Sequence, residues 1–233
     1  MKISHLATCI AALTLALLLS GIAIADNNSM ACDSHSFETH AQLQPGDQAT
    51  SDHLQLSRAL PSQASIYLDV CSADLTVTGS QSGQLEIKLD VGRPATKNAS
   101  DYLQALDISG NEARVQLHLP KSVRAKVTVG IPSSNHAVEV NLARGSLVLA
   151  ADRVTGDRKF NVGYGHVEFD GDKDAYEEMQ VNVGLGSLHD HRPGGDDHHF
   201  VVAHSFEGSG KGAIEINVGM GSVDLNPGPS QPI

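Results

Sequence analysis

Apolar and polar residues alternate in short bursts from Ser65 onward, with glycine, serine or proline between the bursts. Such period-two alternation is typical of strands that bury one face. Pro120 and Pro132 end two of the bursts at positions where a sheet needs no further backbone donor. The pattern therefore predicts short β-strands over residues 66–70, 75–77, 85–89, 115–119 and 125–129.

One stretch, residues 98–107, departs from period two. Tyr102, Leu103 and Leu106 fall three and four positions apart, as on one face of a helix. Asn98 or Ser100 can cap its start. We therefore expect one short helix here, with the chain returning to strand after residues 110–111.

The second half of the chain repeats the segment Asn-Val-Gly-Xaa-Gly. Copies start at Asn161, Asn182 and Asn217, and a degenerate copy starts at Asn141, so the intervals are 20, 21 and 35 residues. A period of about 20 residues is typical of stacked β coils. The longer last interval indicates an insertion after the copy at Asn182.

Apolar positions fall in register when the copies are aligned, but the register slips by one residue after each second glycine. An extra residue between two alternating runs indicates a bend, which glycine accommodates. Each unit is therefore expected to be a strand, a Gly-Xaa-Gly corner and a second strand. Its expected apolar positions are Val140, Leu142, Leu147, Leu149, Phe160, Val162, Tyr164, Val167, Phe169, Val181, Val183, Leu185, Leu188, Ile216, Val218, Met220, Val223 and Leu225.

Two all-β arrangements satisfy this unit. In a β-solenoid, equivalent strands stack in parallel about 4.8 Å apart, whereas in an antiparallel β-sandwich each unit closes as a hairpin across its glycines. Equal spacing and an asparagine repeated at one position favour the solenoid. Its asparagines would then lie above one another and could bond amide to amide. The alternative is that they are merely outward polar residues.

Two residues break the pattern of the repeat. Arg144 stands where the other copies carry Tyr164, Leu185 and Met220, which suits a coil at the edge of the regular stack. Asp190 stands where the other copies carry leucine or phenylalanine. It opens the insertion, so we expect one wall of that coil to turn outward.

Residues 1–25 have the features of a secretory signal peptide. Lys2 precedes an apolar run centred on residues 13–19, and small residues lead to a cleavage site after Ala25. An uncleaved anchor is the alternative, because the apolar stretch approaches spanning length. We expect an exported protein, periplasmic or at the cell surface, with no integral membrane segment after cleavage.

Residues 26–63 are polar and hold no sustained apolar period, so they are expected to form a poorly ordered N-terminal arm. Signal cleavage leaves Cys32 and Cys71 as the only thiols. In an oxidising compartment an even pair usually closes into a disulfide, here worth roughly 4 kcal/mol. Two free thiols are the alternative.

The charge of the chain excludes some partners. It has 16 basic and 27 acidic residues, a net charge of −11 at pH 7, and the basic residues are scattered among acids. Nucleic acids and anionic membrane surfaces are bound by clustered Lys and Arg, so neither is expected. With no Trp and few aromatics, the core must consist mainly of Val, Leu and Ile.

The insertion concentrates histidine and aspartate. Imidazole and carboxylate are ligands that Zn, Ni or Cu select, and a His-Xaa-His pair on a strand places both rings on one face. A solvated acidic loop is the alternative, because Gly194 and Gly195 offer no rigid support. The candidate metal ligands are His189, His191, His198, His199 and His204; no other cofactor is expected.

Other chemistry finds little support in the sequence. The Gly-Xaa-Gly segments lack the third glycine and the helix of a nucleotide-binding loop. No serine lies in a Gly-Xaa-Ser-Xaa-Gly elbow. No catalytic residue is therefore assigned, and a carbohydrate-active enzyme stays an analogy with β-helices that cleave polysaccharides.

Residues 65–226 resemble the adhesin-like, DUF4097-type domains of exported bacterial proteins. The resemblance rests on the opening segment 70–79, the strand ends Leu119-Pro120 and Ile131-Pro132, and the successive Gly-Ser-Val or Gly-Ser-Leu units. It implies a right-handed β-helix-like stack, a surface or envelope role and no established catalytic residues. Fold analogy alone does not establish function.

The sequence thus predicts a signal peptide (1–25), a polar arm (26–63), one β-repeat domain (64–226) and a proline-rich tail (227–233). The domain is expected to be a non-enzymatic structural or interaction module of the bacterial envelope with an unknown protein or cell-surface partner. Periplasmic metal binding is the alternative. Because the tail suits a blunted strand edge, a monomer is expected.

Overall fold

The computed structural model describes residues 32, 41–61, 63–80, 82–92, 97–132, 137–150 and 156–228, and the expected signal peptide lies outside them. Over the described residues the chain is all-β and holds no α-helix. None of the helical segments found there has the length and apolar character needed to cross a membrane.

In the described residues, twelve strands form one mixed, mostly parallel sheet. Short 3-10 helices, η2 (Ala99–Tyr102) and η3 (Lys173–Ala175), lie between them. The strands are β1 (Gln48–Ala49), β2 (His53–Arg58), β3 (Ser65–Gly79), β4 (Leu85–Val91), β5 (Leu103–Ser109), β6 (Glu112–Leu117), β7 (Ala125–Ile131), β8 (Val138–Ala150), β9 (Arg158–Asp170), β10 (Glu178–Asp190), β11 (Asp197–Glu207) and β12 (Ala213–Asn226).

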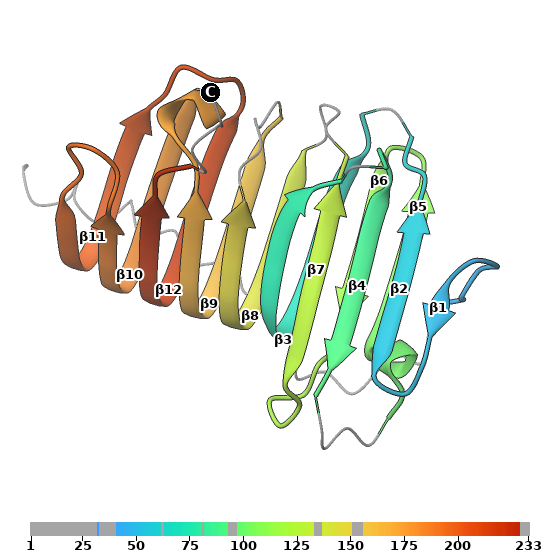
Figure 1. Ribbon diagram of the computed structural model, residues 1–233. Helices are drawn as coiled ribbons and strands as arrows, with labels where there is room; N and C mark the ends of the chain where they lie inside the picture. Colours follow the sequence, from blue (N-terminus) through green and yellow to red (C-terminus); the bar gives the residue numbers. More distant parts are fainter. Residues whose placement is uncertain are drawn as a thin grey trace, which may run out of the picture.

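The sheet folds over on itself into two layers, because its long strands curve round midway along their length (Figure 1). The N-terminal halves of β3, β8, β9, β12 and β10 form the first layer, which β6 and β5 extend beyond β3. Their C-terminal halves form the second layer, which β7, β4, β2 and β1 extend. Strand β11 pairs with both halves of β10.

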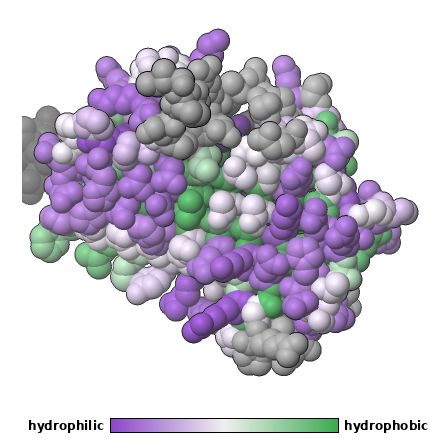
Figure 2. Space-filling view, viewed as in Figure 1, coloured by the Kyte–Doolittle hydropathy of each residue, from purple (hydrophilic) through white to green (hydrophobic). Residues whose placement is uncertain are grey.

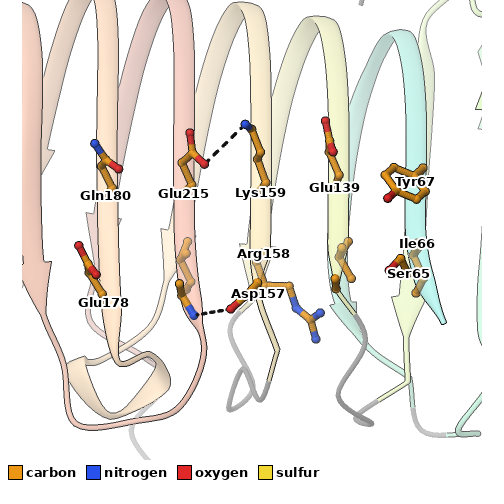
Figure 3. Close-up of a pocket in the computed structure, with 14 residues that line it drawn as sticks. Ser65, Ile66, Tyr67, Glu139, Asp157, Arg158, Lys159, Glu178, Gln180 and Glu215 are labelled. Atoms are coloured by element: carbon orange, nitrogen blue, oxygen red, sulfur yellow. Dashed lines mark hydrogen bonds and ion pairs between the residues drawn. The ribbon is translucent and has the colours of Figure 1, made fainter. Parts of the chain in front are cut away.

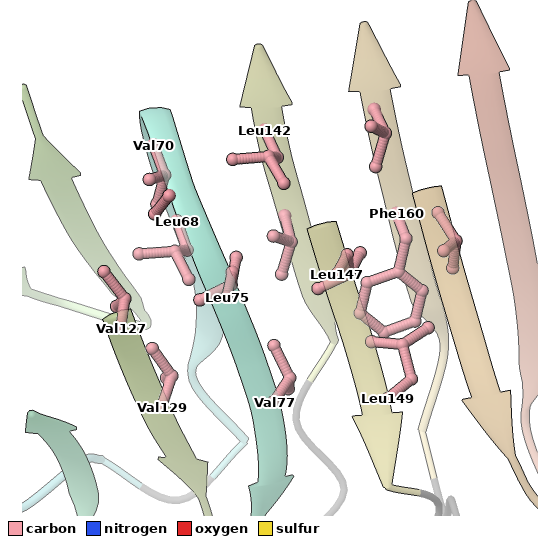
Figure 4. Packing of buried hydrophobic residues seen from close by; sticks show 14 of the residues in the cluster. Leu68, Val70, Leu75, Val77, Val127, Val129, Leu142, Leu147, Leu149 and Phe160 are labelled. Atoms are coloured by element: carbon pink, nitrogen blue, oxygen red, sulfur yellow. The ribbon is translucent and has the colours of Figure 1, made fainter. Parts of the chain in front are cut away.

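The predicted slip of register marks this bend. In β8, Val140 and Leu142 are buried before the corner and Leu147 and Leu149 after it. Figure 4 shows Leu142, Leu147 and Leu149 together with their neighbours on β3 between the layers. One core of mainly Val, Leu and Ile results.

The corner residues themselves were assigned to the wrong side. Tyr164, Leu185 and Met220 were expected inside, but their exposed fractions are 51%, 51% and 45%. Period-two counting continues up to the second glycine, whereas the backbone has already begun to turn at the first. The residue between the two glycines therefore points away from the core.

The repeats pair in parallel, with Asn141 beside Asn161 and Asn217 beside both Asn161 and Asn182. Parallel pairing is incompatible with hairpins closed at the glycines, so the sandwich alternative is wrong. The spatial order β8-β9-β12-β10-β11 differs from the chain order. The insertion predicted as a loop supplies β11, and the chain then returns to place β12 between β9 and β10.

The repeated asparagines form a continuous hydrogen-bonded ladder across the first layer. Asn182 donates to Asn217 at 2.9 Å, Asn217 to Asn161 at 2.9 Å and Asn161 to Asn141 at 2.8 Å. Asn141 then donates to the carboxylate of Asp69 at 2.8 Å. Every amide is oriented the same way, and the ladder ends on a charged acceptor. This is the ladder that stacking predicted.

The predicted helix at 98–107 is wrong. Only the 3-10 helix η2 forms, and Leu103 and Leu106 belong to strand β5, which pairs with β6. The helical spacing of apolar residues covers only one turn. Pairing with β6 instead supplies hydrogen-bond partners for the backbone along β5, and this decides the conformation.

The polar arm contributes more to the fold than its composition suggests. Strand β2 pairs with β4, and its Leu54 and Leu56 are fully buried. Two alternating leucines are too short a pattern to predict a strand from the sequence. They are enough to anchor β2 in the core because β4 already holds its backbone in register. A disulfide joins Cys32 to Cys71 in β3, as predicted.

Glycine is required at the corners because neighbouring coils touch there through their backbones. Gly221 has a φ of +148°, and a Cβ at this position would overlap the carbonyl oxygen of Gly165 in β9. Gly165 stands in the same relation to Gly145 in β8. No side chain larger than hydrogen fits between successive corners.

We expect Gly221→Ala to lower the free energy of unfolding by more than about 3 kcal/mol, because steric overlap adds to a positive-φ cost of about 1–2 kcal/mol. Gly110→Ala is the control, since Gly110 has a φ of +56° with open space around its Cβ position. Urea denaturation of both variants measures the difference. Equal losses would contradict the backbone contact.

We expect Asn217→Ala to lower the free energy of unfolding by about 1–3 kcal/mol, because it leaves polar groups on both neighbours without partners. Asn182→Ala, at the end of the ladder, removes one such bond and should cost roughly half as much. Urea denaturation with an unchanged slope checks both values. A larger loss at Asn182 than at Asn217 would show that the ladder does not act as a chain.

Candidate functional site

A groove of about 380 Å³ crosses the outer face of the first layer. One row of side chains runs along it from β3 to β10, as Figure 3 shows. Parallel pairing puts these residues in register on five strands, one per strand. They are Tyr67, Glu139, Lys159, Glu215 and Gln180.

Small residues make the groove concave. Ser65, Ala137 and Ala213 line it beside the longer side chains of the row. Asp157 accepts a hydrogen bond from the backbone N–H of Ala213 at 3.3 Å, which ties the start of β12 to the turn before β9. The groove therefore lies on a rigid sheet with its backbone groups already paired.

Charges of both signs line the groove. Lys159 Nζ lies 3.6 Å from Glu215 Oε2. Burial lowers the pKa of Arg158 to about 10, and the negative charge of Asp157 opposes this shift. At one end the guanidinium of Arg114 lies 5.5 Å from the centre of the Tyr67 ring. The groove thus offers donors, acceptors and one aromatic surface.

The acids of the row are poorly placed for glycoside hydrolysis. Glu139 and Glu215 stand two strands apart, about 10 Å by strand spacing. Inverting enzymes separate their carboxyl groups by about 6.5–9.5 Å and hold a water between them. Here Lys159 lies on the intervening strand and is paired with Glu215.

Sequence reasoning did not identify this row, although a signal was present. Glu139, Lys159, Gln180 and Glu215 each lie two residues before a repeated asparagine. In a stacked repeat, equal offsets mean one row on one face. The side chains differ in each copy, so the row carries no repeated identity to notice.

The structure separates the five candidate metal ligands into two groups. His189 lies on β10 near His199 of β11, with ring centres 5.6 Å apart, and its ring centre is 6.3 Å from that of His191. His198 and His204 meet with ring centres 4.7 Å apart, and His204 also contacts Phe206.

The geometry of these histidines does not assemble a metal site in the described part of the chain. There, no three His, Cys, Asp or Glu side chains are grouped as ligands of a metal ion. His189 Nδ1 instead lies 3.2 Å from Asp197 Oδ1. Zn, Ni or Cu binding by these residues stays a prediction.

Asp190 points inward and not outward as expected, because a cation neutralises it. Arg192 donates to both carboxylate oxygens of Asp190, at 2.8 and 2.9 Å, and to the hydroxyl of Tyr176 at 2.7 Å. The Arg192 and Asp190 side chains are only 3% and 7% exposed. The guanidinium also lies 4.8 Å from the ring centre of Phe206.

This buried network replaces the leucine or phenylalanine of the other coils at the β10 end of the core. Burial opposes the ionisation of Asp190, but its hydrogen bonds from Arg192 outweigh this and hold the pKa of the carboxyl below its usual value. Burial raises the pKa of Tyr176. Asp190 is therefore a structural residue, and the groove lies elsewhere.

We expect Asp190→Leu to cost about 3–5 kcal/mol of unfolding free energy, because Arg192 is left buried without its anion. The triple variant Asp190→Leu, Arg192→Leu, Tyr176→Phe should recover most of this loss. Denaturant titration of the two variants provides the comparison. A triple variant as unstable as the single one would contradict this account.

The same variants test the pH dependence. The pKa of Asp190 is lower in the folded state than in the unfolded chain, where it is about 3.9. The ionised carboxylate therefore stabilises the fold above that unfolded-state pKa, and this stabilisation is lost as pH falls through the folded-state pKa. The triple variant should therefore lose less stability than the wild type on acidification below about pH 4. Identical acid profiles would contradict the assignment.

No family model matches this sequence, and no curated protein does. Among solved structures, a putative cell adhesion protein from Clostridium sporogenes is 11% identical, with 77% of this chain and 100% of that one covered and a TM-score of 0.47. A putative lipid binding protein from Parabacteroides distasonis is 12% identical, covering 76% and 64% of the chains, with a TM-score of 0.32. A putative adhesin from Bacteroides fragilis is 10% identical, covering 79% and 100%, with a TM-score of 0.22.

Proposed function

We propose that this protein is a non-enzymatic, adhesin-like interaction module of the bacterial envelope, built as a β-solenoid, that binds its partner in the groove of the first layer. The observation that carries the proposal is the row of one outward side chain per strand, from Tyr67 to Gln180, on five strands in register. A rigid repeat face of this kind suits an extended ligand.

The chemistry of the groove fits a glycan chain. Sugar hydroxyls both donate and accept hydrogen bonds, so they need acceptors and donors close together. Glu139 and Glu215 supply acceptors, Lys159 supplies donors, and Gln180 supplies both. Tyr67 adds an aromatic surface with a polar tip at one end, as amphipathic ligands require. The proposed ligand is therefore a neutral, linear oligosaccharide.

Features typical of exported proteins support an envelope role. The first 25 residues have the pattern of a signal peptide, and the Cys32–Cys71 disulfide suits an oxidising compartment. The sequence resemblance to adhesin-like exported domains agrees with this placement.

A panel of linear neutral hexasaccharides of glucose, N-acetylglucosamine, xylose and mannose tests the proposal by calorimetry on the mature chain. We expect at least one to bind. Tyr67→Ala and Glu215→Gln should each weaken that binding about 10-fold, the loss of roughly 1.4 kcal/mol of contact energy.

Matched controls lie on the same two strands in the second layer, where Thr76 belongs to β3 and Asp224 to β12. Thr76→Ala and Asp224→Asn should leave the affinity unchanged. Absence of heat with every sugar, or equal losses in the control variants, would overturn the proposal. Release of reducing sugar during the titration would instead indicate an enzyme.

A further inference from the structure

Strand β11 forms one end of the sheet in both layers. Over Asp197–Glu207 it runs antiparallel to β10, with a bulge between the pairs Phe200–Gly186 and Val202–Val183. Within the described part of the chain no strand pairs with its other side. The monomer expectation relied on the proline-rich tail ending at a strand edge. Strand β12, which leads into that tail, instead lies between β9 and β10. The edge of the sheet is therefore β11.

Apart from this bulge, the edge lacks the usual protection against pairing. Natural edge strands carry lysine, proline or inward-pointing charges, or are very short. Residues 198–206 contain no Lys, Arg, Asp, Glu or Pro, and the only acidic residues of the strand are Asp197 and Glu207 at its ends. A stretch of nine residues without Lys, Arg, Asp or Glu presents its backbone groups as a ready template for another strand.

Two large apolar residues project from the middle of this edge. Phe200 and Val201 are 76% and 73% exposed. The backbone of Phe200 has a φ of +77°, an uncommon conformation for a bulky residue. A folded chain keeps such strain where the surroundings or a function require it. Here it holds an aromatic ring in solvent.

The exposed apolar surface continues from the edge along the corners of the coils. Leu185, Met220 and Tyr164 form one row on β10, β12 and β9, and the guanidinium of Arg144 lies 4.8 Å from the Tyr164 ring centre at its far end. Figure 2 shows apolar side chains projecting along the lower left margin of the molecule, where these corners lie. Contiguous apolar patches of this kind mark interaction surfaces.

The opposite end of the sheet differs from this one. There, the second layer ends in β1, which has two residues, and the first layer ends in β5, which has seven. Neither offers an eleven-residue edge that would match β11. In head-to-tail stacking, β11 would have to pair with the shorter edges of β1 and β5. Two β11 strands, in contrast, are equal in length.

We propose that β11 is the interface between two copies of this chain, paired antiparallel across a twofold axis. Such an isologous contact closes after two subunits and leaves no further edge of this kind. It extends both layers into a continuous sheet and buries Phe200 and Val201 of each copy. Antiparallel pairing also continues the pattern already set by β10 and β11.

Charge selects the register of this pairing. With Val202 on the axis, Asp197 would face the partner copy's Glu207, and like charges directly opposite are unfavourable. With Val201 on the axis, Asp197 faces Ser205, and His198 faces His204, which also contacts it within one copy. We therefore place Val201 on the axis.

Sedimentation of the mature chain over micromolar concentrations is the first test. We expect a dimer that does not grow into longer assemblies. Val201→Lys adds a charge at the middle of the edge and should give a monomer with unchanged thermal unfolding of the monomer fold. Gln55→Lys, at an exposed site on β2 near the opposite end, is the control and should remain dimeric.

Cross-linking tests the register separately. Cys32 and Cys71 are joined to each other, so a new cysteine is the only free thiol of the mature chain. Val201→Cys should form a dimer across the axis under mild oxidation, faster than Gln55→Cys. A monomeric wild type, filaments that grow with concentration, or a dimer untouched by Val201→Lys would each overturn the proposal. None of these outcomes depends on whether sugars bind the groove.

Discussion

Direct contact between backbones at the corners is the constraint on which this structure depends. Where Gly221 approaches Gly165 there is room for a hydrogen atom and nothing larger. This proximity allows each coil to turn from one layer to the other directly above its neighbour. Because the corners align, the strands on both sides align as well. This alignment sets the register of the asparagine ladder and of the row of groove side chains.

The sequence was sufficient where a local rule repeats. The slip of apolar register after each second glycine located the bend, and the fixed asparagine position offered the ladder as one of two possibilities. The sequence could not predict the order of the strands in the sheet, because the repeats are so similar that each could pair with any other. Nothing in the residues of β10 distinguishes pairing with β9 from pairing with β12. That choice depends on the length and path of the insertion that forms β11.

The candidate site shows a different limit. Asp190 was recognised as an exception to the repeat, but its direction depended on Arg192, a partner that the sequence does not mark as buried. The groove residues, such as Glu139 and Lys159, vary from copy to copy and carry no apolar signal. Their common offset from the asparagines becomes informative only once parallel stacking is known. Local alternation along each strand decides that each of these side chains points outward. Which side chains become neighbours across the sheet depends on how the strands pair.

The position of β12 has a consequence for how the chain acquires its fold. The last strand in the sequence is inserted between two strands that precede it. Until those final residues leave the ribosome or the export channel, β9 and β10 present edges compatible with each other, because Asn161 and Asn182 occupy equivalent positions. Their premature pairing would be a kinetic trap with good hydrogen bonds and the wrong neighbour. Because the chain emerges N-terminus first from either exit, the native strand order requires that β9 and β10 stay apart until β12 is available.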